Sequence, residues 1–175
     1  MHIMIDLETM GTTPDAPILA IGAARFDARD GVTHTSYWLI DGASDIAQGA
    51  KPDWATIMWW LRQSEAARME LADPARQRLP IRTALLQLSI FIQETPNLQG
   101  VWGNGPSFDN ALLAAAYRRA SIGFPYHFSK DRCFRTLRAL YPNIAMPFEG
   151  DAHNALADAT WQATLASRIL AAHDF

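Results

Sequence analysis

The hydrophobic and polar positions divide the chain into a strand-rich beginning and a helix-rich remainder. Residues 2–7, 18–26 and 32–40 are rich in apolar, β-branched and aromatic side chains, which is typical of strands. Glycine, proline and aspartate gather between these runs, and residues 27–31 are few enough for a hairpin loop. The pattern therefore predicts three consecutive strands, of which the last two are joined by a hairpin.

Beyond residue 42 the apolar positions recur with helical spacing. Asp53 and Ser107 each precede such a segment and are expected to cap its first turn, and Pro96 ends another segment. We expect helices over residues 54–62 and on through residue 71, over 82–94, 108–120, 131–140 and 154–172, and one more strand over 99–102. Strands followed by helices, with one strand among the helices, predict an α/β or α+β sheet covered by helices.

Composition favours one globular domain. The chain has 175 residues, of which 49% are hydrophobic and 19% charged, so we expect a single domain over residues 1–175. No apolar stretch reaches the length of about 20 residues that a membrane span needs, and the first residues lack the pattern of a secretory signal. We therefore expect a soluble, cytoplasmic protein without a membrane partner. The single cysteine, Cys133, excludes an internal disulfide and a cysteine-rich zinc site.

Two carboxylates interrupt the first predicted strand, which is otherwise apolar. Asp6 and Glu8 are two positions apart, so both point to one face of the strand, while Ile3, Ile5 and Leu7 point to the other. Two like charges on one face repel each other, and a hard divalent cation with oxygen ligands relieves that repulsion. The alternative is a pair of exposed acids on an edge strand.

Two further acids and a histidine stand near the starts of predicted helices. Asp109 lies just inside one helix, where the helix dipole alone favours an acid. Asp158 is flanked by small apolar residues and follows His153 by five positions, which on a regular helix is a rotation of about 140°. Both side chains therefore address one site only if His153 lies at or before the first turn. A purely structural role is the alternative for His153 and for Asp109.

Together these residues resemble the motifs of the DEDD superfamily of 3′-5′ exonucleases, in the branch with histidine in its last motif. The motifs stand in the family's order and span most of the chain, as Asp6-Leu7-Glu8-Thr9, Phe108-Asp109-Asn110, and His153 followed by Asp158. The surrounding sequence looks closest to the ribonuclease T-like and phage-type exoribonucleases. Two departures are Asn154, where an acid is also common in the family, and residues 46–95, which align with no functional motif.

The resemblance implies a fold, a reaction and a set of catalytic residues. The implied fold is ribonuclease H-like, an α/β fold with a mixed central sheet flanked by helices. The implied reaction releases nucleoside 5′-monophosphates from the 3′ end of single-stranded RNA or DNA, with two divalent metal ions, Mg²⁺ or Mn²⁺, as cofactors. The implied metal ligands are Asp6, Glu8, Asp109 and Asp158. His153 is implied to take the proton from the attacking water, a role that suits an imidazole near neutral pH.

Candidate substrate-binding residues lie beside these motifs. By resemblance, the segment that contains Leu7, Thr9, Met10 and Gly11 meets the terminal sugar of the substrate. Phe108 is a candidate for stacking on a base.

The distribution of charge limits where nucleic acid is expected to bind. Because the net charge is −3, the surface as a whole does not attract a polyanion, and any contact must be local. Six of the 15 basic residues fall between residues 118 and 138, and Arg132 and Arg135 are the candidates for contacting phosphates there. Solvated helix faces are the alternative. The adjacent Trp59 and Trp60 cannot share one helix stripe, so one of them meets a second subunit, a base or solvent, and we expect a homodimer.

Two other functions fit the same residues. One is a hydrolase of small phosphodiesters such as dinucleotides, and the other is a catalytically silent module that only binds nucleic acid. A silent module is expected to have lost at least one acid, and none is missing here. The sequence does not separate RNA from DNA, because that choice depends on a contact to one 2′-hydroxyl.

Overall fold

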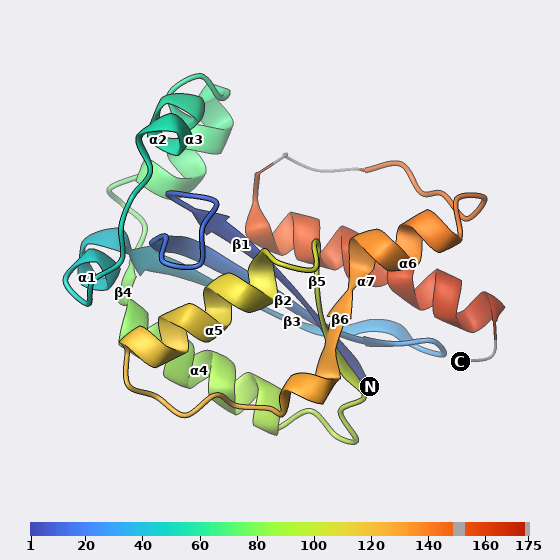
Figure 1. The fold of residues 1–175 in the computed structure, drawn as a ribbon. Helices are drawn as coiled ribbons and strands as arrows, with labels where there is room; N and C mark the ends of the chain where they lie inside the picture. Colours follow the sequence, from blue (N-terminus) through green and yellow to red (C-terminus); the bar gives the residue numbers. More distant parts are fainter. Residues whose placement is uncertain (149–152, 174–175) are drawn as a thin grey trace.

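The computed structural model describes residues 1–148 and 153–173 and contains a six-stranded mixed sheet (Figure 1). The strands are β1 (His2–Thr9), β2 (Ile18–Asp27), β3 (Gly31–Asp41), β4 (Leu79–Pro80), β5 (Gly100–Gly103) and β6 (Asp131–Cys133). Their order in the sheet is β4-β3-β2-β1-β5-β6. β2 pairs antiparallel with β1 and with β3, whereas β5 pairs parallel with β1 and with β6. The mixed α/β architecture expected from the sequence is confirmed.

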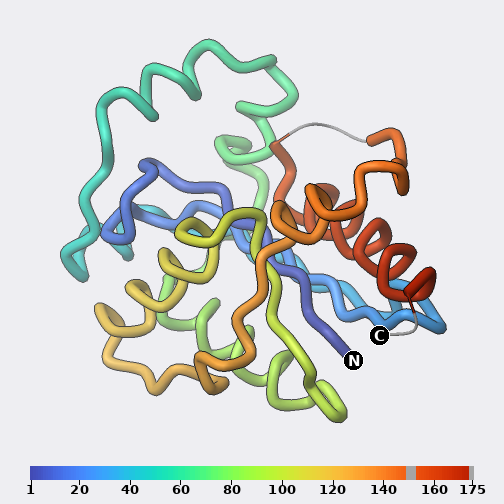
Figure 2. Tube along the Cα trace, turned by 45° about the vertical axis from the view of Figure 1, so that its right-hand side comes forward, coloured from blue at the N-terminus to red at the C-terminus, as the bar shows by residue number. Residues whose placement is uncertain are grey.

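Helices cover both faces of this sheet (Figures 1 and 2). The α-helices of the described residues are α1 (Gly42–Ile46), α2 (Trp54–Trp60), α3 (Glu65–Ala72), α4 (Ile81–Gln93), α5 (Asp109–Arg119), α6 (Phe134–Leu140) and α7 (Ala155–Ala172). α4 and α5 lie on one face, and α7 with α6 lies on the other, while α2 and α3 stand beside the end of β1. A 3₁₀-helix (Phe128–Lys130) precedes β6. Among the described residues, none of the helices has the length and apolar character needed to cross a membrane.

The alternation of side chains along β1 divides the core into two layers. Ile3, Ile5 and Leu7 are buried in the layer between the sheet and helices α4 and α5. Met4 points the other way, into the layer beneath α7. Asp6 and Glu8 share the face of Met4 because strand side chains repeat with period two, so the predicted separation of acids from apolar residues on this strand is confirmed.

One glycine sets how closely α7 approaches the sheet. Gly22 on β2 is paired with Asp6 on β1, and a β-carbon at position 22 would overlap the main-chain carbonyl of Ala155, the first residue of α7. No side chain fits between β2 and the start of this helix. The first turn of α7, which carries Asp158, is therefore seated directly on the strand beside Asp6.

Most of the predicted elements are confirmed, and the exceptions have tertiary causes. Ser107 was expected to cap a helix, but the N-cap residue of α5 is Phe108, which makes no side-chain capping bond, so this prediction is wrong. The helix expected over residues 131–140 begins only at Phe134, because residues 131–133 pair with β5 instead. Asp53 does cap its helix, accepting from the main-chain N–H groups of Ala55 and Thr56.

Candidate active site

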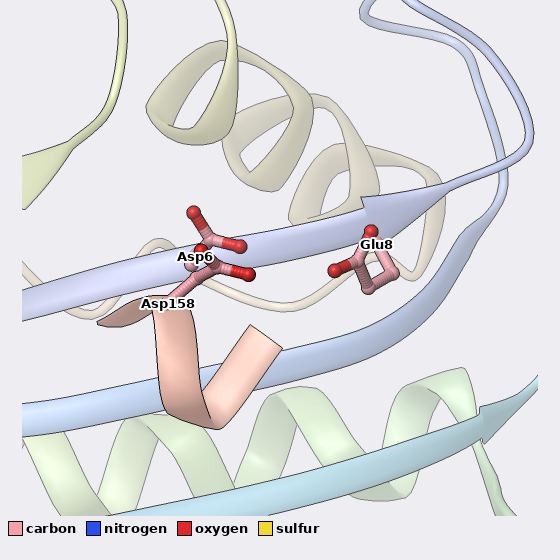
Figure 3. A group of neighbouring side chains, drawn as sticks. All are labelled: Asp6, Glu8 and Asp158. Atoms are coloured by element: carbon pink, nitrogen blue, oxygen red, sulfur yellow. The ribbon is translucent and has the colours of Figure 1, made fainter. Parts of the chain in front are cut away.

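Three of the predicted carboxylates converge at the carboxyl-terminal part of β1 (Figure 3). Asp6 and Glu8 come from β1 and Asp158 from the first turn of α7, and each offers one carboxylate oxygen, all within 4.8 Å of one another. Figure 3 shows the carboxylates of Asp6 and Asp158 next to each other, with Glu8 farther along the same strand. We refer to these three residues as the acidic cluster.

Burial and mutual repulsion make the acidic cluster hard to ionise without a cation. Burial raises the pKa of Asp6 well above its ordinary value, and the charges of Asp109, Glu8 and Asp158 raise it further. Burial, followed by the charges of Asp158 and Asp109, raises the pKa of Glu8 to about 8. Burial also raises the pKa of Asp158. Closely spaced oxygen donors of this kind suit a hard divalent ion, which would offset the repulsion.

Asp109 lies beside the acidic cluster without being one of its three members. It is buried at the start of α5, where one carboxylate oxygen accepts from the N–H of Leu7 at 3.2 Å and the other from the N–H of Asn104 at 2.6 Å. Burial raises the pKa of Asp109 to about 6, against these hydrogen bonds and the charge of Arg135, which lower it. A carboxylate has about four lone-pair sites, so the main-chain N–H groups of Asn104, Leu7 and Asp109 do not use all of them. Asp109 therefore has a fixed orientation and free acceptor capacity.

Gln162 is a member of this site that the sequence analysis missed. It lies one helical turn after Asp158 on α7, is 2% exposed, and donates from Nε2 to a carboxylate oxygen of Asp6 at 2.7 Å. Its Oε1 is buried and has no hydrogen-bond partner among the described residues. An unpaired buried acceptor next to carboxylates is costly, and a hydrated cation could supply the missing donor. The spacing of four from Asp158 was the available signal in the sequence.

His153 lies immediately before the N-cap of α7, as the sequence analysis required. Its φ of 70° is in the left-handed region, and its main-chain N–H donates to the carboxylate of Asp158. The imidazole packs against two indoles of α2, with ring centroids 4.9 Å from Trp59 and 5.9 Å from Trp60. Helix α2 belongs to the segment for which the sequence offered no functional motif.

A pocket of about 440 Å³ opens beside Glu8. Of the predicted substrate-binding residues, Leu7, Thr9, Gly11 and Phe108 line it. Met10 is not among its lining residues, and the carbonyl of Met10 accepts from the main-chain N–H of Asp53 at 2.7 Å. The far wall consists of residues on and just before α2, namely Asp53, Ala55, Thr56, Trp59 and Trp60. The pocket therefore adjoins the acidic cluster and has aromatic rings in its wall.

The basic residues that the sequence places between positions 118 and 138 have different surroundings in the structure. The guanidinium group of Arg135 lies near Gly105, and its charge is felt by Asp109. Arg132 is exposed, and its guanidinium donates to the main-chain carbonyls of three residues, Ser129, Asp131 and Gln99. Arg119 forms an ion pair with the fully buried Asp45, in which its Nη2 lies 3.0 Å from Oδ2 of the carboxylate. Only Arg135 of these three arginines is close to the candidate site.

The comparisons with known proteins agree with this geometry. A family model described as the 3′-5′ exoribonuclease Rv2179c-like domain matches residues 1–170. A crystal structure of the nuclease domain of 3′hExo, a DEDDh family member bound to rAMP, matches with a TM-score of 0.64 at 12% identity. That match covers 98% of this chain and 92% of the nuclease domain, so the two share a fold. No curated protein matches the chain in sequence.

Proposed function

The chain belongs to the Rv2179c-like family of 3′-5′ exoribonuclease domains, and from this premise we propose that it is a metal-dependent exonuclease acting on single-stranded 3′ ends. It would release nucleoside 5′-monophosphates one at a time, and residues 1–175 would form a single exonuclease domain. RNA is the substrate that the family description favours. The nuclease domain of similar fold is bound to rAMP, a nucleoside 5′-monophosphate.

The observation that carries the proposal is the acidic cluster. Asp6, Glu8 and Asp158 place carboxylate oxygens within 4.8 Å of one another at the carboxyl-terminal part of β1, an interior strand of the sheet, with the buried Asp109 alongside. Such an arrangement is electrostatically unfavourable without a cation. An apolar cluster of similar volume would stabilise the fold at least as well. The cluster therefore has a functional explanation, which is the binding of divalent ions.

The proposed mechanism assigns a task to each group of residues. Asp6, Glu8, Asp109 and Asp158 would hold two Mg²⁺ or Mn²⁺ ions, which when bound neutralise the phosphodiester and stabilise the developing charge on the leaving oxygen. His153 takes a proton from the attacking water. Its position next to Asp158 puts the imidazole at the edge of the acidic cluster.

The pocket beside Glu8 supports the placement of the terminal nucleotide. Its volume of about 440 Å³ is of the size found for small-ligand sites. Leu7, Thr9 and Gly11 border the position proposed for the sugar, and Phe108 offers a ring for stacking. Met10 is not proposed to contact it, because its main-chain N–H and carbonyl are bonded to Pro17 and Asp53. An unpaired base at the end of a strand fits such a pocket, whereas a paired base would bring its complement with it.

Phosphates upstream of the terminal nucleotide would be bound by the basic residues. Arg135 is the stronger candidate, because its guanidinium lies near Gly105 on the loop that leads to Asp109. Arg132 is the weaker one, because its donors already serve main-chain carbonyls.

The direct test uses 5′-labelled single-stranded RNA and DNA 20-mers of the same sequence, with dinucleotides assayed in parallel, each incubated with Mg²⁺, Mn²⁺ or a chelator. We expect a ladder that shortens from the 3′ end only with metal, and faster on RNA. Cleavage restricted to dinucleotides would favour the small-phosphodiester hydrolase. Binding of the 20-mers without cleavage under any metal would favour the silent module.

Variants connect the reaction to the acidic cluster. Asp158→Asn removes one charge with little change of volume and is expected to reduce turnover at least 100-fold while the protein stays folded. Asp30→Asn, at an exposed position of the β2–β3 hairpin, is the matched control and keeps normal turnover. Normal turnover by Asp158→Asn would contradict the metal assignment.

We also propose that the chain forms a homodimer. The support is an exposed apolar strip on α4, where Leu86 is 45% and Ile90 is 54% exposed, one turn apart on the side away from the core. Sedimentation equilibrium at micromolar concentration decides this, since a strict monomer would refute it.

A further inference from the structure

The rings of Trp60, Trp59 and His153 pack edge to face in a row that begins at the buried Trp60. Trp60 is buried at the end of α2, and its ring centroid lies 4.9 Å from that of Trp59. Trp59 in turn lies 4.9 Å from the His153 imidazole, with the two ring planes at 84°. Edge-to-face packing of this kind favours a particular mutual orientation of the rings. This packing therefore constrains the orientation of the His153 imidazole ring.

The main chain at His153 does not hold this orientation by itself. Histidine in the left-handed region is a strained conformation that persists where its surroundings enforce it. On the C-terminal side the residue is held through the hydrogen bond from its N–H to Asp158. The imidazole itself makes ring contacts with Trp59 and Trp60.

Helix α2 is in turn fixed to the strand that carries Glu8. The indole N–H of Trp60 donates to the carbonyl of Thr9 at 2.9 Å, and the main-chain N–H of Asp53 donates to the carbonyl of Met10 at 2.7 Å. These carbonyls belong to the two residues that directly follow Glu8, next to an irregularity in the β1–β2 pairing. The position of α2 is thus set from the end of β1.

From this chain of contacts we infer that Trp59 is a positioning residue for His153, with Trp60 as its anchor on β1. Trp59 holds the imidazole beside the acidic cluster. Trp60 fixes the position of Trp59 relative to β1 through its hydrogen bond to the carbonyl of Thr9. This assigns a role to helix α2 in the reaction, and the inference rests on the proposed function, in which His153 takes the proton from water.

A double-mutant cycle tests the inference, because a residue that acts through His153 loses its effect once His153 is gone. Single-turnover rates on a labelled RNA would be measured for Trp59→Ala, His153→Ala and the double variant. We expect Trp59→Ala to lower the rate roughly 10- to 100-fold, as small misplacements of a reacting group do, and to add less than 2-fold in the His153→Ala background. Trp59→Phe keeps a ring and is expected to restore most of the rate.

Trp54→Ala is the matched control on the same helix, since Trp54 is 71% exposed and is not among the residues that line the pocket. Two measurements independent of turnover accompany the cycle. The Mn²⁺ dissociation constant, from calorimetry, is expected to be unchanged in Trp59→Ala. The His153 ring signals in NMR spectra are expected to move in Trp59→Ala and to stay in Trp54→Ala, because the indole ring current is lost only in the former.

The outcomes separate the inference from the proposed function. An equal loss from Trp59→Ala in both backgrounds would show that Trp59 acts on the substrate alone, and would overturn the inference while leaving the proposed function standing. An unchanged rate in His153→Ala would defeat the assignment of the base, and the inference with it. Unmoved His153 signals in Trp59→Ala would also overturn the inference.

Discussion

At the scale of single residues, the acidic cluster determines how the metal-free protein responds to pH. The pKa of Glu8 is about 8 in the folded protein, against an ordinary value of 4.5, and that of Asp6 is also raised. Between these two pH values the folded protein retains a proton that the unfolded chain has released. The free energy of unfolding therefore falls as pH rises from about 4.5 to about 8, by up to ~1.4 kcal/mol per pH unit for each such group.

Urea unfolding in a chelating buffer between pH 5 and pH 8 measures this dependence. Glu8→Gln removes one of the groups, so its stability is expected to fall less steeply with pH than that of the parent protein. Added Mn²⁺ should remove most of the pH dependence of the parent protein's stability, because metal binding stabilises the folded state. Equal slopes for the parent protein and Glu8→Gln would contradict the assignment of a raised pKa to Glu8.

Gln162 is expected to affect the affinity for metal. Its side-chain amide donates to one carboxylate oxygen of Asp6 and leaves the other oxygen available for a metal ion. Partners of ligand residues typically change metal affinity 10- to 100-fold when they are removed, so Gln162→Leu should weaken Mn²⁺ binding roughly 10-fold in calorimetry. Thr164→Val, which removes a hydroxyl that donates only to the Thr160 carbonyl of the same helix, is the control and keeps the parent affinity.

The difference between these residues explains which part of the site could be predicted from the sequence. Asp6 and Glu8 were accessible because strand periodicity alone places them on one face, and Asp158 because an acid stands among small apolar residues. For Gln162 the local signal was only its spacing of four from Asp158, and for Trp59 only its position next to Trp60, and neither signal identifies a partner. Their roles arise from contacts between segments that are 156 and 94 residues apart, Gln162 with Asp6 and Trp59 with His153, which no local pattern encodes.

At the scale of elements, the contact between α7 and β2 controls whether the site is assembled. Gly22→Ala places a methyl group where the main chain of Ala155 lies, so the helix must move or the strand must bend. Overpacking of this kind typically costs about 1–3 kcal/mol. We expect thermal unfolding to show that loss of stability, and calorimetry to show weaker Mn²⁺ binding, because Asp158 moves with the helix.

Gly123→Ala serves as the control for this substitution, because a β-carbon at position 123 meets no atom within 4 Å and its stability should match that of the parent protein. If Gly22→Ala were as stable as Gly123→Ala and bound Mn²⁺ equally well, the close seating of α7 on β2 would be disproved.

Short elements were the ones that the sequence could not predict. Asp131 to Cys133 continue a helical pattern, yet they pair with β5, because completing the sheet edge outweighs the propensity of three residues. Position 107 has a good capping residue, but α5 begins one residue later than expected, with the side chain of Asp109 accepting from Leu7 and Asn104. In both cases a tertiary hydrogen bond overrides a local preference.

At the scale of the whole molecule, the net charge of −3 leads us to expect that nucleic acid is bound locally, by few basic residues. Arg135→Ala is expected to weaken RNA binding and to reduce the slope of log affinity against log salt by about one. Arg132→Ala should produce a smaller change, since its donors serve three carbonyls. Fluorescence anisotropy between 50 and 200 mM salt, roughly the range over which such contacts are screened, measures both.

Arg29→Ala, on the exposed β2–β3 hairpin, is the control for these arginine variants and should keep the parent slope. An unchanged slope for Arg135→Ala would mean that this arginine does not contact phosphate.

The overall architecture was accessible from the sequence because it depends on patterns that many sequences satisfy. Three strands, a hairpin and a helical remainder were enough to predict an α/β or α+β sheet covered by helices, and a similar fold occurs in a nuclease domain that is only 12% identical. The placement of α2 beside β1 was not accessible, because it depends on two hydrogen bonds to the carbonyls of Thr9 and Met10.

The acids of the site are distributed from one end of the chain to the other, and this has a consequence for biosynthesis. A growing chain leaves the ribosome with its N-terminus first, so Asp6, Glu8 and Asp109 emerge well before Asp158. The cluster is incomplete until α7 has been synthesised and has docked against Gly22. A partly made chain therefore cannot assemble the proposed metal site, and metal-dependent activity is expected only after the last helix has docked.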